Sequence, residues 1–327
     1  MRVFQHRNVN GAYHHAMHLI HHIGVPEDTR NGPVRVFLEP ICTVYRQPNE
    51  RVLMDPDRRA NPFFHLFESM WMLAGRNDGK WLDTYVSDFS SRFGEPHKDG
   101  RIHGAYGYRW RNHFGGDQLE KLIALLQADP GTRQAVLQMW DPRHDLGADV
   151  RDKPCNTSIY FRRIQDTLDM TVSCRSNDIV WGAYGANAVH MSVLLEYMAW
   201  RLETRVGIYR QVSNNLHLYD SSTVTFDISK PLIDPYANGI IKAHPLFTGL
   251  DAEQYAFEDQ LDEWMESPTT AVSGTPGSIF DTLLIPMAVA HSLWKNKERN
   301  KAIVVAETIT HTDWRAAALQ WINHKST

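Results

Sequence analysis

Cys155 is the residue of this chain whose surroundings best fit covalent chemistry. It follows Lys153 and Pro154 in a proline-led turn that would place the thiol at the start of a strand. The thiolate is the reactive form of cysteine, and neighbouring cations favour it. Arg133 and Arg175 lie on separate expected strands that could bring guanidinium groups beside the same pocket. Because a guanidinium also binds two phosphate oxygens at once, the set predicts a nucleophile beside a phosphate site.

Glu68 is a second candidate for chemistry. Glutamate usually lies on a protein surface, but the neighbours of Glu68 along its expected helix are apolar on most sides: Phe64, Phe67, Trp71 and Met72. A carboxylic acid held in such surroundings can shuttle protons beside a reacting ring. An ordinary surface carboxylate remains the alternative for Glu68, as an inert buried thiol does for Cys155.

The hydrophobic pattern indicates the elements that position these residues. Helical spacing of apolar residues predicts five helices, at 12–23, 62–73, 117–127, 188–202 and 312–322. Short runs rich in β-branched and apolar residues predict four strands, at 134–140, 158–163, 168–174 and 206–212. Gln165 and Asp166 make a hairpin turn between two of them. The arrangement predicts an α+β fold in which helices cover a mostly antiparallel sheet.

Composition limits the class of protein. The 327 residues are 43% hydrophobic and 22% charged, which is typical of a globular protein, and without a repeat or linker they predict one domain. The net charge of -4 argues against a surface that coats nucleic acid. Three cysteines do not suggest a disulfide framework, so a cytoplasmic location fits best. We expect no membrane association, because no apolar run is long enough for a signal peptide or a membrane span.

An ordered set of motifs resembles the thymidylate synthase family. It runs from Pro154-Cys155 through 174–182 (CRSNDIVWG) and Asn187 to 217–219 (HLY). Two further segments agree: 65–71 (HLFESMW) is similar to the family's helix with a catalytic glutamate, and 104–111 (GAYGYRWR) is similar to its Tyr-Gly-x-x-Trp-Arg segment. Each motif is weak alone, whereas the ordered set is specific. The match covers about residues 25–222, so we expect a single domain over 1–327 with a divergent part from about 223.

The resemblance implies a role for each matched residue. Four are expected to be catalytic, with Cys155 adding to C6 of a pyrimidine nucleotide, Glu68 and Tyr106 managing protons and water, and Asp178 addressing the ring and the folate. The remaining matched residues are expected to bind substrate. They are Arg30, Arg175 and Ser176 for the 5′-phosphate, Arg133 for the same phosphate from a second subunit, Asn187 for the base, and His217 and Tyr219 for the sugar hydroxyl.

The resemblance also implies partners. The family builds its pocket across a homodimer in which the sheets pack together, and it uses 5,10-methylenetetrahydrofolate. The expected partners of this chain are therefore a pyrimidine nucleoside monophosphate, the folate and a second copy of the chain. Addition of the thiolate at C6 makes C5 nucleophilic toward the methylene carbon of the folate.

Several positions depart from the synthase pattern. Gln134 replaces a second arginine, Asn156 replaces the usual histidine, and the loop at 183–187 is one residue longer. The segment 86–89 (VSDF) lacks two tryptophans, and the end at 323–327 (NHKST) is not the apolar tail that closes over the folate. Hydride transfer requires a site closed to water. We therefore expect water, rather than hydride, to capture the exocyclic methylene and give a 5-hydroxymethyl nucleotide with tetrahydrofolate.

This outcome resembles the cytidylate 5-hydroxymethylase branch of the family, which includes the phage deoxycytidylate enzymes and the CMP hydroxymethylase of mildiomycin biosynthesis. We expect CMP or dCMP as substrate, with cytosine favoured over uracil and the sugar open. An asparagine amide can satisfy either base according to how it is turned. The alternative is a thymidylate synthase or a dUMP hydroxymethylase that acts on dUMP.

Other classes of function remain alternatives. A Cys-His hydrolase would pair Cys155 with His190 or His217, but it would explain neither the arginines nor Glu68. A protein that binds nucleotides or RNA without catalysis is possible too, because a fold does not fix a function. Histidines recur at helical spacing at positions 14, 18 and 21. They lack an accompanying carboxylate or cysteine, so a polar helix face is the simpler explanation and we expect no metal.

Overall fold

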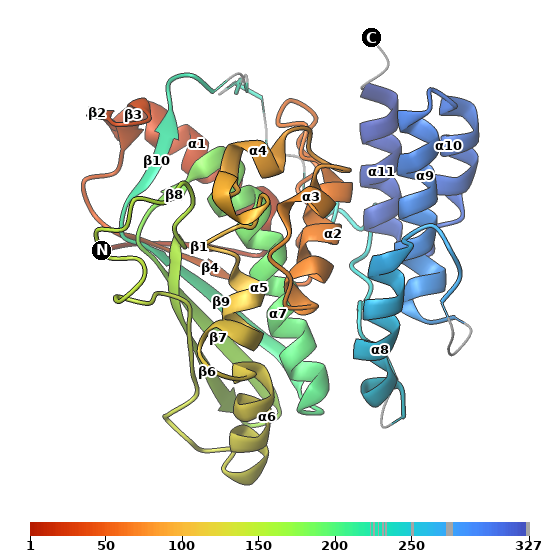
Figure 1. The fold of residues 1–327 in the computed structure, drawn as a ribbon. Helices are drawn as coiled ribbons and strands as arrows, with labels where there is room; N and C mark the ends of the chain where they lie inside the picture. Colours follow the sequence, from red (N-terminus) through yellow and green to blue (C-terminus); the bar gives the residue numbers. More distant parts are fainter. Residues whose placement is uncertain are drawn as a thin grey trace.

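The computed structural model describes residues 1–324 except 223, 225, 228, 231, 233, 250, 251 and 273–276. A six-stranded sheet has the order β1 (Arg2–His6), β4 (Ile41–Tyr45), β9 (Arg205–Ser213), β7 (Thr167–Cys174), β6 (Asn156–Ile164) and β5 (Val136–Gln138). A smaller sheet has the order β2 (Val25–Thr29), β3 (Gly32–Val36), β10 (Leu216–Tyr219) and β8 (Asn177–Asp178). Figure 1 shows the two sheets at the same side of the molecule.

Most strand pairings are antiparallel, as expected, but some are parallel. Neighbours are antiparallel except for β1–β4, β7–β9 and β8–β10, which are parallel. The sheets are therefore mixed. The α+β class and the four expected strands are confirmed, and Gln165 of the expected hairpin turn has a left-handed φ of 55°.

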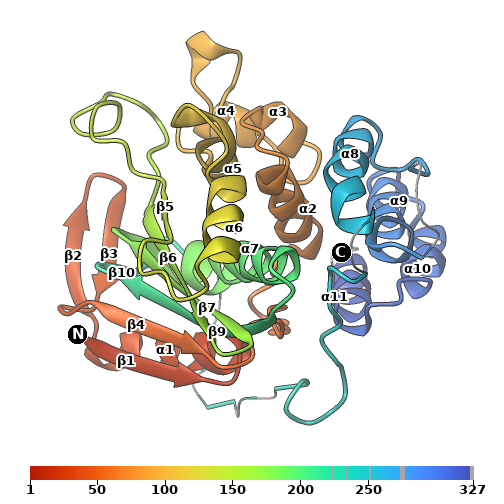
Figure 2. The ribbon, with the colours of Figure 1, turned by 90° about the horizontal axis from the view of Figure 1, so that it is seen from below.

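The helices form two groups (Figure 2). Those among or beside the sheets are α1 (Val9–Ile23), α2 (Pro62–Leu73), α3 (Gly79–Leu82), α4 (Phe89–Phe93), α5 (Tyr106–Tyr108), α6 (Gln118–Ala128) and α7 (Asn187–Arg201), with a 3-10 turn η1 (Pro96–Lys98) and π-helices η2 (Arg109–His113) and η3 (Ile179–Ala186). The C-terminal group, which lies on the far side of α2, comprises α8 (Ala252–Glu266), the π-helix η4 (Phe280–Leu284), α9 (Ile285–Lys295), α10 (Arg299–Glu307) and α11 (Thr312–His324). All five expected helices are confirmed.

Helix α2 lies between these two groups. Asn61 caps it by accepting from the Phe64 amide at 3.1 Å, and Pro62 occupies its first turn, where no amide hydrogen is needed. Glu68 is the one residue of this fully described helix that is not buried. Contacts with α7 cover one side, and those with α9 and α11 cover another. The candidate carboxylate is therefore held on a helix that is otherwise enclosed in the core.

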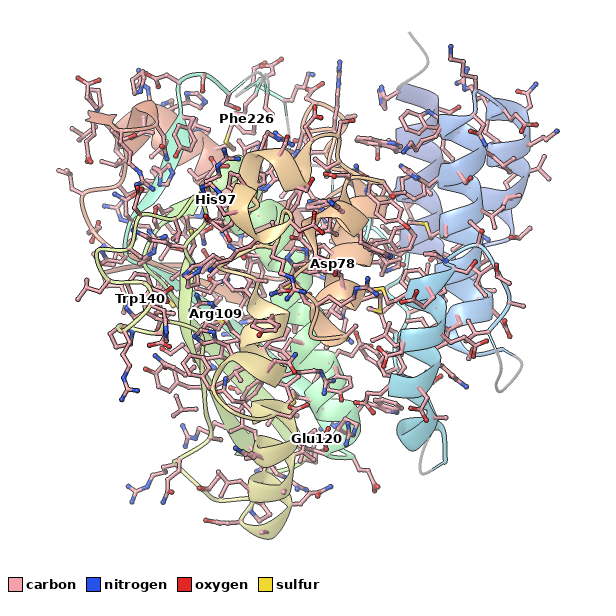
Figure 3. All side chains as sticks on the ribbon, viewed as in Figure 1. Asp78, His97, Arg109, Glu120, Trp140 and Phe226 are labelled. Carbon is pink, nitrogen blue, oxygen red and sulfur yellow. The ribbon has the colours of Figure 1, made fainter. Side chains whose placement is uncertain are left out.

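Buried polar contacts fix the loops around the sheet. Figure 3 labels Arg109, which is fully buried and binds both carboxylate oxygens of Asp145 at 2.7 and 2.8 Å. Arg109 also donates to the Met139 carbonyl at 2.6 Å. Such a bidentate pair, with its further hydrogen bond, compensates for burying the charge. It joins the segment of Tyr106 to the end of β5.

One row of side chains crosses the large sheet on the face turned away from α7. Tyr160, Thr171 and Arg210 are register partners on β6, β7 and β9, and all three are at least partly exposed. Their sequence neighbours Ile159, Val172 and Gln211 are buried. The alternation shows that one face of this sheet is packed and the other is open within a single chain.

In the part of the chain that the structure describes, every helix is too short or too polar to cross a bilayer. The cytoplasmic location stays a prediction, and so does the description of 1–327 as one domain. Of the expected C-terminal tail at 323–327, residues 325–327 lie outside the described residues.

Candidate active site

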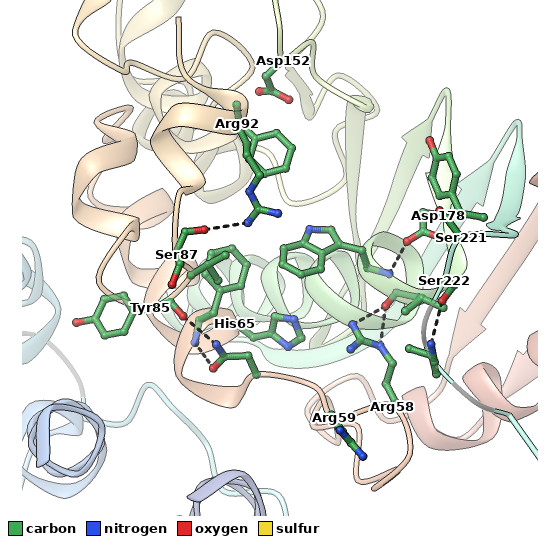
Figure 4. Close-up of a pocket in the computed structure, with 18 of the residues that line it drawn as sticks. Arg58, Arg59, His65, Tyr85, Ser87, Arg92, Asp152, Asp178, Ser221 and Ser222 are labelled. Carbon is green, nitrogen blue, oxygen red and sulfur yellow. Dashed lines mark hydrogen bonds between the residues drawn. The ribbon is translucent and has the colours of Figure 1, made fainter. Parts of the chain in front are cut away.

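A cavity of about 1810 Å³ opens between the sheets, α2 and the C-terminal helices (Figure 4). It brings together seven residues that the sequence predicted for the site: Arg30, Cys155, Arg175, Ser176, Asp178, His217 and Tyr219. Ten arginines and lysines line it, against three aspartates. This excess of positive charge suits an anionic ligand, because a cleft concentrates the field of its charges.

Cys155 lies where the chain enters β6. Nη2 of Arg175 is 3.8 Å from its Sγ, and the same guanidinium holds the turn by donating to the carbonyls of Pro154 at 3.0 Å and Lys153 at 3.1 Å. Burial raises the pKa of the Cys155 thiol, while Arg175 lowers it. The cation therefore offsets part of the effect of burial, and in the absence of ligand the thiol form is favoured.

Tyr106 supports the nucleophile through the backbone. Its hydroxyl oxygen accepts from the amides of Cys155 at 3.2 Å and Asn156 at 3.1 Å. Burial holds the pKa of Tyr106 well above its usual value, so the group remains a neutral phenol. Its own O–H is free to point at a further acceptor, which is what the expected role in handling protons and water needs.

Glu68 faces His190 on α7. Oε2 of Glu68 and Nε2 of His190 are 3.2 Å apart, and the two side chains are 15% and 3% exposed. Burial raises the pKa of Glu68 to about 8, with Asp152 adding to the effect, and burial lowers the pKa of His190 to about 3. At neutral pH the pair is therefore a carboxylic acid beside a neutral imidazole.

The tautomer of His190 follows from its second contact. The His65 carbonyl accepts a hydrogen bond from the ring of His190, whereas Nε2 has no hydrogen-bond partner among the described residues. Nδ1 therefore carries the hydrogen and Nε2 is an acceptor. Oε2 of Glu68 is 3.2 Å from this acceptor, and only a protonated Glu68 could donate to it, which agrees with the direction of both pKa shifts.

Buried amides link the neighbour of the nucleophile to Asn187. Asn156 Nδ2 donates to Asn187 Oδ1 at 3.0 Å, Asn187 Nδ2 donates to Asn177 Oδ1 at 3.1 Å, and Asn177 Nδ2 donates to Ser213 Oγ at 3.0 Å. We call these four residues the amide relay. Each hydrogen bond in the relay fixes which atom of the next side chain is the donor and which is the acceptor. The side-chain amide of Asn187 is therefore held in one orientation, with Oδ1 toward Asn156 and Nδ2 toward Asn177. Asn156, the residue expected to replace a histidine of the family, is a structural part of the site because it donates to Asn187.

The longer segment before Asn187 is not a loop. It forms the π-helix η3, and Asp178 caps it by accepting from the Trp181 amide. A π-helix accommodates an additional residue within a helix, often at a functional site. The extra residue is therefore absorbed in η3, and Asn187 begins α7 directly after it.

Asp178, His217 and Tyr219 form the wall on the smaller sheet. His217 and Asp178 are register partners on β10 and β8, and the rings of His217 and Tyr219 lie 5.0 Å apart. The expectation that both β10 side chains point the same way is met. Burial raises the pKa of Asp178 and lowers that of His217, and each opposes the shift of the other.

Arg133 lies apart from this cavity. It is exposed, just before β5, and is not among the described residues that line the cavity within one chain. The sequence suggested Arg133 and Arg175 beside one pocket, and in a single chain only Arg175 is there. Glu68, Tyr106 and Asn187 are not among the described residues that line the cavity. Tyr106 is joined to the lining residue Cys155 by a hydrogen bond, and the charge of the lining residue Asp152 acts on Glu68.

Two residues that line the cavity, Asp152 and Arg58, were not predicted from the sequence. Asp152 accepts from the Gly104 amide at 3.1 Å, and its charge raises the pKa of both Cys155 and Glu68. Arg58 donates to the Val180 carbonyl at 2.6 and 2.9 Å and so braces the start of η3. Asp152 could have been predicted, because it lies three residues before Cys155. Arg58 could not, because its contact partner Val180 is distant in sequence.

Three side chains of metal-ligand type meet outside the cavity. Oδ2 of Asp141 lies 2.9 Å from His113 Nε2 and 2.7 Å from His144 Nδ1, and Oδ1 accepts from the Arg143 amide. Hydrogen bonds thus account for both oxygens, and the cluster is explained as a polar network. His14, His18 and His21 do not form such a group among the described residues.

Comparison with known proteins matches the order of these residues. The sequence profile described as thymidylate synthase matches residues 12–234.

The chain belongs to the thymidylate synthase family.

Members of this family transfer one-carbon units to pyrimidine nucleotides and use methylenetetrahydrofolate. The chain is 42% identical over 341 residues to the deoxyuridylate hydroxymethyltransferase of Pseudomonas phage M6, an alignment that covers 99% of this chain and 95% of the relative. It is 36% and 29% identical to proteins of the same name from Bacillus phage SP01 and Delftia phage PhiW-14, over 59% and 60% of this chain. These alignments span 53% and 56% of the two phage proteins.

The comparisons confirm the predicted family and the predicted class of enzyme, a hydroxymethyltransferase of the thymidylate synthase family. They do not support the cytidylate branch, because these three relatives are named for deoxyuridylate. The roles of the individual site residues stay predictions.

Proposed function

We propose that the enzyme converts dUMP to 5-hydroxymethyl-dUMP with methylenetetrahydrofolate as the one-carbon donor. The observation that carries the proposal is the placement of Cys155 beside Arg175 in a cationic cavity backed by the Glu68–His190 pair. Uracil replaces cytosine as the expected base because the relative that aligns over 99% of the chain is named for deoxyuridylate. The same name is the reason to propose deoxyribose as the sugar of the substrate.

In the proposed reaction Cys155 Sγ adds to C6 of the uracil, which forms the S–C6 bond and moves electron density to C5 and O4. Arg175 would assist twice, because its charge favours the thiolate and its position suits the 5′-phosphate. When bound, methylenetetrahydrofolate supplies a carbon at the oxidation level of formaldehyde. Bonding of C5 to this carbon, release of the C5 proton to solvent and departure of tetrahydrofolate would leave an exocyclic methylene conjugated with the C4 carbonyl.

Glu68 and His190 are proposed to handle the water that captures this methylene. The water oxygen forms a bond to the methylene carbon, and the electrons return to O4 of the ring. The water proton passes to Oε1 of Glu68 while the proton on Oε2 is transferred to Nε2 of His190, which lies 3.2 Å from Oε2. The S–C6 bond then breaks, which restores the C5–C6 double bond and frees Cys155. General acid–base help of this kind contributes roughly 10²–10⁴-fold.

Asn187 is proposed to read the base. Its amide has one donor and one acceptor left after the amide relay is made, which matches O4 and N3–H of uracil. Cytosine would need the reverse polarity at the same edge. The relay supports discrimination because turning Asn187 would break two buried hydrogen bonds at once.

A homodimer is proposed to complete the phosphate site. The open face of the large sheet, with Tyr160, Thr171 and Arg210 in one row, supports pairing of two chains through their sheets. Arg133 is exposed at the edge of that sheet and would reach the cavity of the partner. Arg30 lines the cavity of its own chain.

Product analysis tests the function directly. The enzyme is incubated with methylenetetrahydrofolate and, separately, dUMP, dCMP and CMP, and the nucleotides are identified by mass spectrometry. We expect a product heavier than dUMP by one CH₂O unit. A methylated product from dUMP would instead establish a thymidylate synthase, and turnover of a cytidine nucleotide without turnover of dUMP would refute the choice of base.

A further inference from the structure

The C-terminal helices form part of the cavity although the family profile ends at residue 234. Helices α9 and α11, the turn between α9 and α10, and the start of α10 contribute six lining residues, namely His291, Trp294, Lys295, Lys297, Arg299 and Trp321. We call these six residues the C-terminal wall. In Figure 4 helices from this end of the chain border the same space as Tyr85 and Ser87.

The C-terminal wall is firmly attached to the part of the chain that carries Glu68. The ring of His291 packs between Phe63 and Tyr85, at 5.0 Å from each centroid. Lys295 Nζ donates to the Thr84 carbonyl at 3.0 Å. On α8, below the wall, Trp264 packs on Phe67 at 5.3 Å. The wall is therefore a fixed surface, positioned relative to α2 by buried aromatic contacts.

Aromatic rings are the first feature of this surface. Trp294 and Trp321 lie 6.2 Å apart, and both are only partly buried and open to the cavity. The two tryptophans thus give this side of the cavity an aromatic surface.

Positive charge is the second feature. Lys295, Lys297 and Arg299 are exposed, and the six residues of the wall include no acidic side chain. Arg299 is held in place by a 2.8 Å hydrogen bond to Oδ1 of Asn323. Flat aromatic rings bordered by cations fit a ligand that has both an aromatic ring system and carboxylates.

The cavity has room for a second ligand beside a nucleotide. Single-ligand pockets measure roughly 300–1,000 Å³, whereas this cavity measures about 1810 Å³. The nucleotide would take the side with Cys155, Arg175 and His217. The space beside the C-terminal wall is then left for another molecule.

We propose that the C-terminal wall binds the aminobenzoyl-glutamate end of the folate. Trp294 and Trp321 contact its rings, and Lys297 and Arg299 attract its carboxylates. The identity of the ligand rests on the proposed function, but the binding surface belongs to residues outside the family profile. The C-terminal helices therefore have a substrate-binding role as well as a structural one.

Binding measurements test this without turnover. Tetrahydrofolate is titrated by calorimetry into enzyme saturated with dUMP, and dUMP is titrated alone. For Trp294→Leu we expect the Kd for tetrahydrofolate to rise up to about tenfold, the loss typical of one aromatic contact. Lys297→Glu, an exposed change that leaves the core intact, should raise it several-fold and weaken its dependence on salt. The Kd for dUMP should stay within about twofold.

Matched controls are available in the same chain. Trp200, which stacks on Phe247 away from the cavity, is replaced by leucine, and Lys301, on the outer side of α10, by glutamate. Neither change should alter the Kd for tetrahydrofolate. Unchanged tetrahydrofolate binding in both Trp294→Leu and Lys297→Glu would overturn the inference, as would an equal loss of dUMP binding. If wild-type enzyme binds tetrahydrofolate through the wall but yields no hydroxymethyl product, the proposed function fails and this inference stands.

Discussion

Nε2 of His190 and Oε2 of Glu68 lie 3.2 Å apart in a site that excludes charge from both. Burial keeps the carboxyl of Glu68 protonated and the imidazole of His190 neutral, and the unprotonated Nε2 is the ring atom nearest the carboxyl. Glu68 thus has a possible acceptor for its own proton inside the protein. This arrangement suits a reaction in which water must lose a proton during attack.

Replacement of His190 by glutamine should slow water capture selectively. Glutamine can still accept from Glu68 through its oxygen, but it cannot take up the proton. We expect the rate of 5-hydroxymethyl product to fall by roughly 10²-fold, while release of tritium from C5 of labelled dUMP is largely retained. Added 2-mercaptoethanol should then trap more of the methylene as a thioether.

His311→Gln is the matched control, because His311 is also a buried histidine bound to a backbone carbonyl, and it lies outside the cavity. Equal loss of tritium release and of product in His190→Gln would argue for a structural role of His190 instead.

The stability of Glu68→Gln relative to wild type should depend on pH. The pKa of Glu68 rises from 4.5 in the unfolded chain to about 8 in the fold. Between these values only the folded state keeps the proton, so wild type loses stability as pH rises. Glutamine does not titrate. The difference in Tm, variant minus wild type, should therefore increase from pH 5 to pH 8, and a difference independent of pH would exclude a buried neutral acid.

Removal of the charge of Asp152 should make Cys155 more reactive. The carboxylate raises the pKa of the thiol, so Asp152→Asn lowers it and increases the thiolate fraction. We expect iodoacetamide to alkylate Cys155 several-fold faster at pH 7.5, as read by mass spectrometry of the modified peptide. Cys42 and Cys174, which are buried, provide the internal reference. Slower alkylation would show that Asp152 positions the turn more than it opposes the thiolate.

Disruption of the amide relay should weaken discrimination between bases. In Asn156→Ala the Oδ1 of Asn187 loses its donor, and the amide can turn. The ratio of kcat/KM for dUMP over dCMP should fall by about tenfold, in line with one buried hydrogen bond of roughly 1–1.5 kcal/mol. Thr157→Ser, at the next position of β6, is a suitable control. An unchanged ratio with lower kcat for both nucleotides would contradict the role of the relay.

Complementation tests the contribution of Arg133 across a dimer. Arg133→Ala and Cys155→Ala should each be nearly inactive. Mixed and refolded together, they should form hybrid dimers with one site that has both an intact Cys155 and a partner arginine. We expect recovery of up to about a quarter of wild-type activity from statistical pairing. Absence of recovery, with hybrid dimers present, would place Arg133 outside the site.

Local sequence patterns predicted the elements with a clear period or cap. Helix α2 is an example, since Asn61, Pro62 and an apolar run define it alone. The strands β2, β3 and β10 could not be found in this way, because they are short and depend on pairing partners distant in sequence. The parallel pairing of β7 with β9 is likewise set by the crossover through α7, which no local signal encodes.

The candidate site divides in a similar manner. Cys155, Arg175 and the β10 pair were identifiable because the family motifs contain them. His190 was considered only as a hydrolase partner, since its contact with Glu68 requires α2 and α7 to pack at one height. The longer segment at 183–187 favoured cytosine, but an asparagine alone does not encode its own orientation and can satisfy either base. That orientation depends on Asn156 and Asn177, which reach Asn187 only in the folded chain.

Helix α2 packs against both α7 and the C-terminal helices, so substitutions in one of these regions constrain substitutions in the other. Eleven of its residues are buried, so a change in the size of a side chain on α9 or α11 shifts the helix that carries Glu68. The C-terminal helices therefore cannot diverge independently of the helix that carries Glu68, even though the family profile ends before them. Exchange of this region between relatives should succeed only when the facing residues of α2 are exchanged with it.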